Sequence, residues 1–181
     1  MEMISTILKK YDTDKDKGHH YGAAYDKILS PFKREEKLNI IEIGTDKGES
    51  LLAWKEYFPN AKITGIDIVD KVSNKNKKIN YIISDIKDYK PSENFDIVID
   101  DGSHWLRDVI ETVNKFAYKL NKNGILVIED VQDYRVWIPV VATLLAPFLP
   151  YNKGYNFEII CCDLRSINNQ YDDFLIDHAS P

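Results

Sequence analysis

The chain is poor in cysteine: only two occur among 181 residues, and they are neighbours, Cys161 and Cys162. Adjacent cysteines rarely form a disulfide with each other, and no spaced set exists that would build a disulfide framework. We therefore expect a reducing compartment, the cytoplasm. Both thiols are interpreted as buried packing residues rather than as nucleophiles or redox groups.

Long apolar runs and massed basic segments are also absent. No run reaches the ~18–20 residues of a membrane span, and the N-terminal MEMISTILKK lacks a signal-peptide pattern. The net charge is -5, and the 24 Lys and Arg residues are spread along the chain. The one dense basic run, residues 71–78, is typical of a solvated loop. These absences argue against a membrane or nucleic-acid partner.

What the chain does contain is an alternation of strand-type and helix-type segments. Near-continuous apolar runs, typical of strands buried on both faces, predict strands at residues 38–44, 61–68, 79–85, 95–101, 124–130, 157–164 and 172–178. Helices are predicted at residues 3–11, 21–29, 48–58, 105–120 and 137–149, with a polar loop at 12–20. The helix over 105–120 is expected to be stopped by Asn123-Gly124. The alternation predicts an α/β fold with a doubly wound parallel sheet, and a short connection makes the last two strands antiparallel to each other.

We expect one domain over residues 1–181, because the composition, 44% hydrophobic and 29% charged, suits a single globular core. Residues 1–36 form its helical N-terminal segment, and residues 37–181 form the α/β core.

Five successive predicted strands each finish in an acidic residue. In order along the chain, these acids are Glu42, Asp67, Asp85, the pair Asp100 and Asp101, and the pair Glu129 and Asp130. In open α/β sheets the ligand crevice lies outside the carboxyl ends of the strands, so these carboxylates should converge on one site.

The turn after the first strand, EIGTDKG, limits the choice of ligand. Gly44 and Gly48 allow a tight turn and a close approach to a ligand, but Asp46 replaces the middle glycine of a nicotinamide fingerprint. The acids here favour an ammonium or sulfonium group over a pyrophosphate. Asp67 is placed to accept from a ribose diol, and Asp85 from an adenine amino group. Each acid alone could be a loop or cap residue; together they favour a nucleoside with a cationic centre.

With its ordered motifs EIGTDKG, GIDI, SDI and FDIVIDD, the chain resembles the class I S-adenosylmethionine (SAM)-dependent methyltransferases. The resemblance implies a Rossmann-like, mostly parallel seven-stranded sheet with an antiparallel last strand, and SAM as cofactor. Asp46 stands where many members carry a glycine. The implied cofactor-binding residues are Glu42, Gly44, Thr45, Gly48, Ser50, Asp67, Ile68, Asp85, Ile86 and Asp100, with Thr13 and Tyr21 from an N-terminal segment that folds over SAM as a lid.

A narrower resemblance rests on SLLAWKEYFPNAKITGIDI, DDGSHW, IEDVQ and the N-terminal TDK…HHY…Y. These motifs are similar to those of the metal-dependent O-methyltransferases of macrolide sugars. The resemblance implies methylation of a hydroxyl on a sugar or glycan-like small molecule with neighbouring hydroxyls. Because the chain is compact, a neighbouring subunit of a homo-oligomer could complete the acceptor site.

The residue types at the fourth and fifth strand ends fit this chemistry. Asp101, Glu129 and Asp130 would repel one another unless a divalent cation neutralised them, and oxygen ligands favour Mg²⁺ or Mn²⁺. Such a cation lowers the pKa of a bound hydroxyl, and His104 is placed to take its proton as general base. Asp100 is left out of the ligand set because consecutive strand residues point to opposite faces.

Simpler interpretations remain open. Asp100 and Asp101 could cap the helix that begins near Ser103, His104 could be an ordinary first-turn residue, and Glu129-Asp130 could be a polar strand end. Tyr134, Arg135 and Trp137 could contact the acceptor or form a surface loop. The competing functions are a cephalosporin-hydroxylase-like metal enzyme of similar fold and a non-catalytic SAM-binding module.

Overall fold

The computed structural model describes residues 2–146, 159–161 and 174–176. Packing divides the chain into two compact units, Met1–Asp130 and Val131–Pro181, and each is described by itself. The prediction of one domain over residues 1–181 therefore stays a prediction. Among the described residues, no helix has both the length and the apolar composition needed to cross a membrane.

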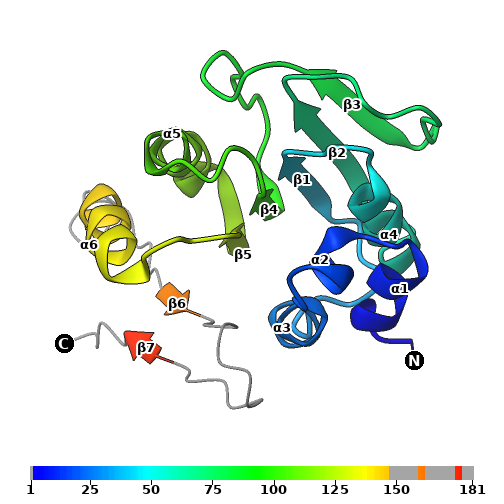
Figure 1. Ribbon diagram of the computed structural model, residues 1–181, viewed down its shortest axis with the longest axis horizontal. Helices are drawn as coiled ribbons and strands as arrows, with labels where there is room; N and C mark the ends of the chain where they lie inside the picture. The colour runs from blue at the N-terminus through cyan, green and yellow to red at the C-terminus, as the bar shows by residue number, and fades with distance from the viewer. Residues whose placement is uncertain (1, 147–158, 162–173, 177–181) are drawn as a thin grey trace. The chain divides into compact units, whose positions relative to one another are not determined.

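The first unit is built on a five-stranded sheet, coloured cyan to yellow-green in Figure 1. Its strands are β1 (Asn39–Ile43), β2 (Lys62–Asp67), β3 (Ile79–Ile83), β4 (Phe95–Asp100) and β5 (Leu120–Ile128). The order is β3-β2-β1-β4-β5, and every neighbouring pair is parallel. The strand order reverses between β1 and β4, which is where ligands bind in such sheets. The predicted parallel α/β fold is confirmed.

Two apolar clusters cover the two faces of this sheet. On β1, Ile40 packs into the first cluster, with Trp54 of α4 (Glu49–Tyr57) and with Phe58, which follows that helix. Ile41 packs into the second cluster, with Phe116 of α5 (Leu106–Phe116). Successive strand residues point to opposite faces, so a strand covered on both sides must be apolar throughout. That is why the strands of this chain read as apolar runs rather than as alternating patterns.

Three short helices precede the sheet: α1 (Ile4–Lys10), α2 (Asp14–Lys17) and α3 (Gly22–Ile28). Helices α1 and α3 were expected and are confirmed. Helix α2 corrects the predicted polar loop over residues 12–20. Its DKDK sequence has the polarity of a loop, but the Lys15 side chain turns inward and is buried.

The connection from α5 to β5 also differs from the prediction. Helix α5 ends at Phe116, a 3-10 turn covers Ala117–Lys119, and β5 begins at Leu120, before the expected stop at Asn123-Gly124. Asn123 adopts a left-handed φ of 64° inside the strand, at an irregularity in its pairing with β4. The Asn-Gly pair therefore accommodates a distortion of β5 instead of ending a helix.

The second unit contains α6 (Tyr134–Leu145), with Pro139 inside it, and an antiparallel pair formed by β6 (Ile159–Cys161) and β7 (Phe174–Ile176). The proline-containing helix and the antiparallel final strands are confirmed. The pair forms its own two-stranded ladder, so the seven-stranded sheet stays a prediction. Cys162 lies outside the described residues.

Candidate active site

The turn after β1 lies against the segment after β4. Gly44 and Gly48 have φ values of 81° and 85°. A Cβ on Gly44 would lie 2.0 Å from the carbonyl oxygen of Asp101, so no other residue fits there. The Asp101 N–H donates to the Ile43 carbonyl at 2.9 Å. Gly44 thus brings the predicted cofactor turn and the DDGSHW motif together.

Asp67, at the end of β2, holds this turn in place. Its Oδ2 accepts from the N–H groups of Thr45 at 3.0 Å and Asp46 at 2.9 Å, and its Oδ1 accepts from the Val69 N–H. The side chain of Ile68 beside it is 69% exposed. In the structure this carboxylate stabilises the turn after β1, and its predicted contact with a ribose stays a prediction.

Asp85 and Ile86 follow β3. Asp85 Oδ1 accepts from the Lys87 N–H at 2.9 Å, whereas the side chain of Ile86 packs in the second apolar cluster. The exposed apolar side chains at the ends of β2 and β3 are Ile68, Val69 and Ile83. Sequence reasoning missed Ile83, because it reads as one more residue of a buried strand.

Glu42 is buried at the end of β1 and accepts hydrogen bonds from side chains of α4. Its Oε2 accepts from Ser50 Oγ at 2.9 Å and from Trp54 Nε1 at 2.8 Å. Its Oε1 has no hydrogen bond but lies 3.2 Å from Lys15 Nζ. Burial raises the pKa of Glu42, and the Lys15 ammonium opposes that rise. The predicted pair Glu42 and Ser50 is therefore in direct contact.

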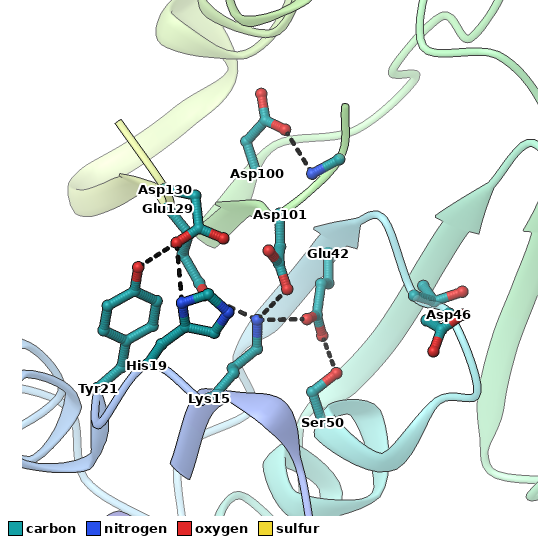
Figure 2. Close-up of polar contacts among 12 residues, drawn as sticks. Lys15, His19, Tyr21, Glu42, Asp46, Ser50, Asp100, Asp101, Glu129 and Asp130 are labelled. Atoms are coloured by element: carbon teal, nitrogen blue, oxygen red, sulfur yellow. Dashed lines mark hydrogen bonds and ion pairs between the residues drawn. The ribbon is translucent and has the colours of Figure 1, made fainter. Parts of the chain in front are cut away.

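Lys15 is the centre of the carboxylate cluster, as Figure 2 shows. Its Nζ donates to Asp101 Oδ2 at 2.5 Å and to Glu129 Oε1 at 2.8 Å. Burial by itself would lower the pKa of Lys15, but Glu42, Glu129 and Asp101 together raise it well above its usual range. The side chain is a buried ammonium, and sequence reasoning missed it.

Glu129 faces Lys15 on one side and the N-terminal helices on the other, where the buried Tyr25 hydroxyl donates to Glu129 Oε1. Burial raises the pKa of Glu129, and the charge of Lys15 opposes that rise. In this arrangement Glu129 is occupied by Lys15 and Tyr25, and its predicted part as a metal ligand stays a prediction.

Asp130 lies between two histidines. Its Oδ1 is 3.2 Å from His19 Nδ1 and accepts from the Tyr21 hydroxyl, and its Oδ2 is 3.7 Å from His104 Nε2. One ligand atom each of Asp101, His104 and Asp130 lie within 4.8 Å of one another. The two carboxylates at this spacing are fitting oxygen donors for one divalent cation, and the imidazole lies beside them.

Left-handed backbone at residues other than glycine accompanies this group. His104 has a φ of 57° and Asp130 a φ of 53°, and Asp46 in the first turn has a φ of 42°. Such conformations are uncommon for non-glycine residues and cluster at functional sites, where the surroundings hold them. Two of these residues, His104 and Asp130, are predicted for the site from the sequence; the other described non-glycine residues with left-handed φ are Asp12, His20 and Asn123.

Asp100 points away from Lys15 (Figure 2) and is buried, with its Oδ1 accepting from the Gly102 N–H at 3.2 Å. Its Oδ2 has no hydrogen-bond partner in the described part of the chain. Neither Asp100 nor Asp101 caps α5, whose N-cap is Trp105 without a side-chain cap. The helix-cap interpretation of the two acids is therefore wrong.

The N-terminal segment contributes Thr13 and Tyr21 as well as Lys15. Thr13 precedes α2 and is buried, and its Oγ1 has no hydrogen-bond partner among the described residues. Tyr21 stacks on His19 with ring centroids 5.1 Å apart. This segment reaches the acids of β1, β4 and β5 from outside the sheet (Figure 2).

A parallel sheet with a glycine turn after β1 and acids at successive strand ends defines a Rossmann-like, nucleotide-binding α/β class. Residues 17–166 match the family model described as a methyltransferase domain. The chain belongs to this methyltransferase family, and the resemblance to class I methyltransferases is confirmed.

The chain is 32% identical over 143 residues to 8-demethyl-8-alpha-L-rhamnosyl tetracenomycin-C 2'-O-methyltransferase of Streptomyces olivaceus, covering 71% of this chain and 38% of that protein. It is 32% identical to demethylmacrocin O-methyltransferase of Streptomyces fradiae, covering 71% and 36%. A solved complex of MycE methyltransferase from the mycinamycin pathway with Mg, SAH and mycinamycin VI matches with a TM-score of 0.64 and 30% identity, over 77% of this chain and 42% of that one. The chain spans little more than a third of the length of these curated relatives.

Proposed function

We propose that the chain is a SAM-dependent O-methyltransferase that, with Mg²⁺ or Mn²⁺, methylates a hydroxyl of a sugar or glycan-like acceptor carrying neighbouring hydroxyls. The observation that carries the proposal is the group Asp101, His104 and Asp130 at the ends of β4 and β5, next to the Gly44 turn. The names of the tetracenomycin and macrocin relatives, which are O-methyltransferases, support the reaction type.

The cofactor is proposed to lie along the carboxyl ends of β1, β2 and β3. The turn residues Gly44, Thr45, Gly48 and Ser50 would approach its methionine part, close to Glu42. Asp67 keeps one lone pair, on Oδ1, beyond its three backbone hydrogen bonds with which to accept from a ribose. Asp85 and the exposed Ile68 would flank the adenine.

The acceptor is proposed to lie at the ends of β4 and β5. A divalent cation held by Asp101 and Asp130, with Glu129 behind them, would bind two neighbouring hydroxyls and lower the pKa of the one to be methylated. His104 would take the proton at its Nε2, and Asp130, 3.7 Å away, would stabilise the resulting imidazolium. SAM would supply the methyl group and leave as S-adenosylhomocysteine, and the strand-end residues would position the acceptor hydroxyl for in-line transfer, which supplies much of the rate.

The segment over residues 1–36 is proposed to act as a lid over this site, with Thr13 and Tyr21 towards the cofactor. The contacts of Tyr21 and Lys15 with the strand-end acids support this part. A homo-oligomer is proposed to complete the acceptor pocket.

A non-catalytic SAM-binding module is the second candidate, favoured by one observation: Lys15 already neutralises part of the cluster. Calorimetric titration with S-adenosylhomocysteine, with NAD as the control, tests the cofactor. We expect stoichiometric binding of the former alone. Turnover on vicinal-diol sugars that needs Mg²⁺ and is lost in His104→Ala supports the enzyme. Cofactor binding without any metal-dependent turnover supports the module.

A further inference from the structure

Lys15 is unusual because it is a cation inside the protein. Its side chain is 1% exposed, and it is the only buried lysine or arginine among the described residues. Its three partners, Glu42, Asp101 and Glu129, come from the ends of β1, β4 and β5. A buried charge is costly unless it is paired, so the surrounding fold must be arranged to compensate it.

The same contacts sort the acids into two sets. Glu129 gives its Oε1 to Lys15 and to Tyr25, and Glu42 gives its two oxygens to Lys15, Ser50 and Trp54. Asp130 has no contact with Lys15 and faces His19, Tyr21 and His104 instead. Asp101 is the member common to both sets, since it contacts Lys15 and belongs to the group with His104 and Asp130.

We propose that Lys15 is a built-in cation of the active site, a positioning residue that neutralises Glu42 and Glu129 and shares Asp101 with a single divalent ion held by Asp101 and Asp130. In this arrangement Glu129 is a lysine-bound rather than a metal-bound carboxylate. The part that concerns the divalent ion rests on the proposed function; the part that concerns neutralisation does not.

Lys15 could instead only anchor the N-terminal segment, and the two roles predict opposite effects of removing Lys15 on metal affinity. An ammonium close to the ligand carboxylates repels a divalent cation, so its removal should tighten metal binding. If Lys15 only anchored the N-terminal segment, its removal would loosen the ligands and weaken metal binding.

The test compares wild type with Lys15→Met, Lys15→Arg and the double variant Lys15→Met/Glu129→Gln. Lys62→Met is the matched control, since Lys62 is paired with one carboxylate, Glu93, at an exposed site. Thermal unfolding without metal is the first measurement. Binding of Mn²⁺, followed by the electron paramagnetic resonance signal of the free ion, is the second.

We expect Lys15→Met to lower the Tm by about 10 °C without metal, because a buried cluster loses its only ammonium. Mn²⁺ should bind Lys15→Met on the order of tenfold more tightly than wild type and restore most of the lost Tm. Lys15→Arg keeps the charge and should keep the wild-type Mn²⁺ affinity within a factor of about three. The double variant, with one carboxylate charge fewer, should be more stable than Lys15→Met, which keeps the test decisive if the single variant does not fold.

An unchanged Tm, or Mn²⁺ binding to Lys15→Met that is equal to or weaker than in wild type, overturns the proposal. So does a double variant no more stable than the single one. Binding of S-adenosylhomocysteine and metal-dependent turnover by wild type separate this failure from that of the proposed function: if wild type shows both, the methyltransferase proposal survives the loss of the Lys15 proposal.

Discussion

The carboxyl edge of the sheet has two halves that use the same residue type differently. At the ends of β1, β4 and β5, Glu42, Asp101 and Glu129 are compensated by one buried ammonium. At the ends of β2 and β3, Asp67 and Asp85 accept from backbone N–H groups and stand beside exposed apolar side chains. The first half is organised around cations. The second is organised to present lone pairs and apolar surface, which suits a neutral nucleoside.

The largest expected loss of stability comes from a substitution at Gly44, where the turn after β1 contacts the segment after β4. Gly44→Ala should destabilise the fold by roughly 4 kcal/mol, because its Cβ would overlap the Asp101 carbonyl and its φ is left-handed. Gly18→Ala is the control, since a Cβ there meets its nearest atom at 3.4 Å. Denaturant unfolding measures both. Equal stability of the two variants would mean that the turn does not touch the DDGSHW segment.

The second prediction separates chemistry from cofactor binding. His104→Ala should lower turnover about 10²- to 10³-fold, the usual contribution of a general base, with the affinity for S-adenosylhomocysteine unchanged. Steady-state kinetics on a sugar acceptor and calorimetry measure the two quantities. Normal turnover in His104→Ala would show that His104 is not the general base. Loss of S-adenosylhomocysteine binding in this variant would show that His104 contributes to the cofactor site instead.

The third prediction compares two acids of the second half. Asp67→Asn should cost about 2 kcal/mol of stability, because its carboxylate accepts from Thr45, Asp46 and Val69. Asp85→Asn should leave stability within about 0.5 kcal/mol, since Asp85 accepts from one exposed N–H. Both variants should bind S-adenosylhomocysteine more weakly. Denaturant unfolding and calorimetric titration of both variants measure these effects. The account is contradicted if Asp85→Asn is the less stable variant, or if neither variant loses affinity for S-adenosylhomocysteine.

The smallest expected loss of stability comes from removing the hydrogen bond that Trp54 donates to Glu42. Trp54→Phe removes the Nε1–H that donates to Glu42 Oε2 at 2.8 Å and should cost about 1.5 kcal/mol. Trp105→Phe, at a side chain that is largely exposed, should change stability by less than about 0.5 kcal/mol. The difference between the two free energies of unfolding is the measured quantity. If the two variants are equally stable, the hydrogen bond to Glu42 contributes nothing.

The sequence predicts the second half of this comparison better than the first. Strand runs with acids at their ends, such as the segment ending in Asp67, are local patterns, and parallel strands bring their carboxyl ends to one edge. Lys15 has no local signature: within DKDK a lysine reads as solvated, and its partners are 27 to 114 residues away along the chain, at Glu42, Asp101 and Glu129. Only the tertiary position of α2, beside α1 and facing the acids at the strand ends, turns that lysine inward.

The boundary between α5 and β5 was mispredicted for a related reason. Asn-Gly is a frequent helix stop, but here the strand pairing with β4 begins at Leu120 and absorbs both residues. Tertiary pairing overrode the local signal, as it did for α2.

The most direct test of the two-half arrangement is the paramagnetic broadening of bound S-adenosylhomocysteine by Mn²⁺, recorded by proton NMR. The account predicts that the methylene protons beside the sulfur, near Glu42 and the metal acids, broaden strongly, that the adenine protons broaden least, and that Asp101→Asn abolishes the effect. Broadening that is strongest at the adenine, or none beyond that of free Mn²⁺, would contradict a cation site next to the methyl donor.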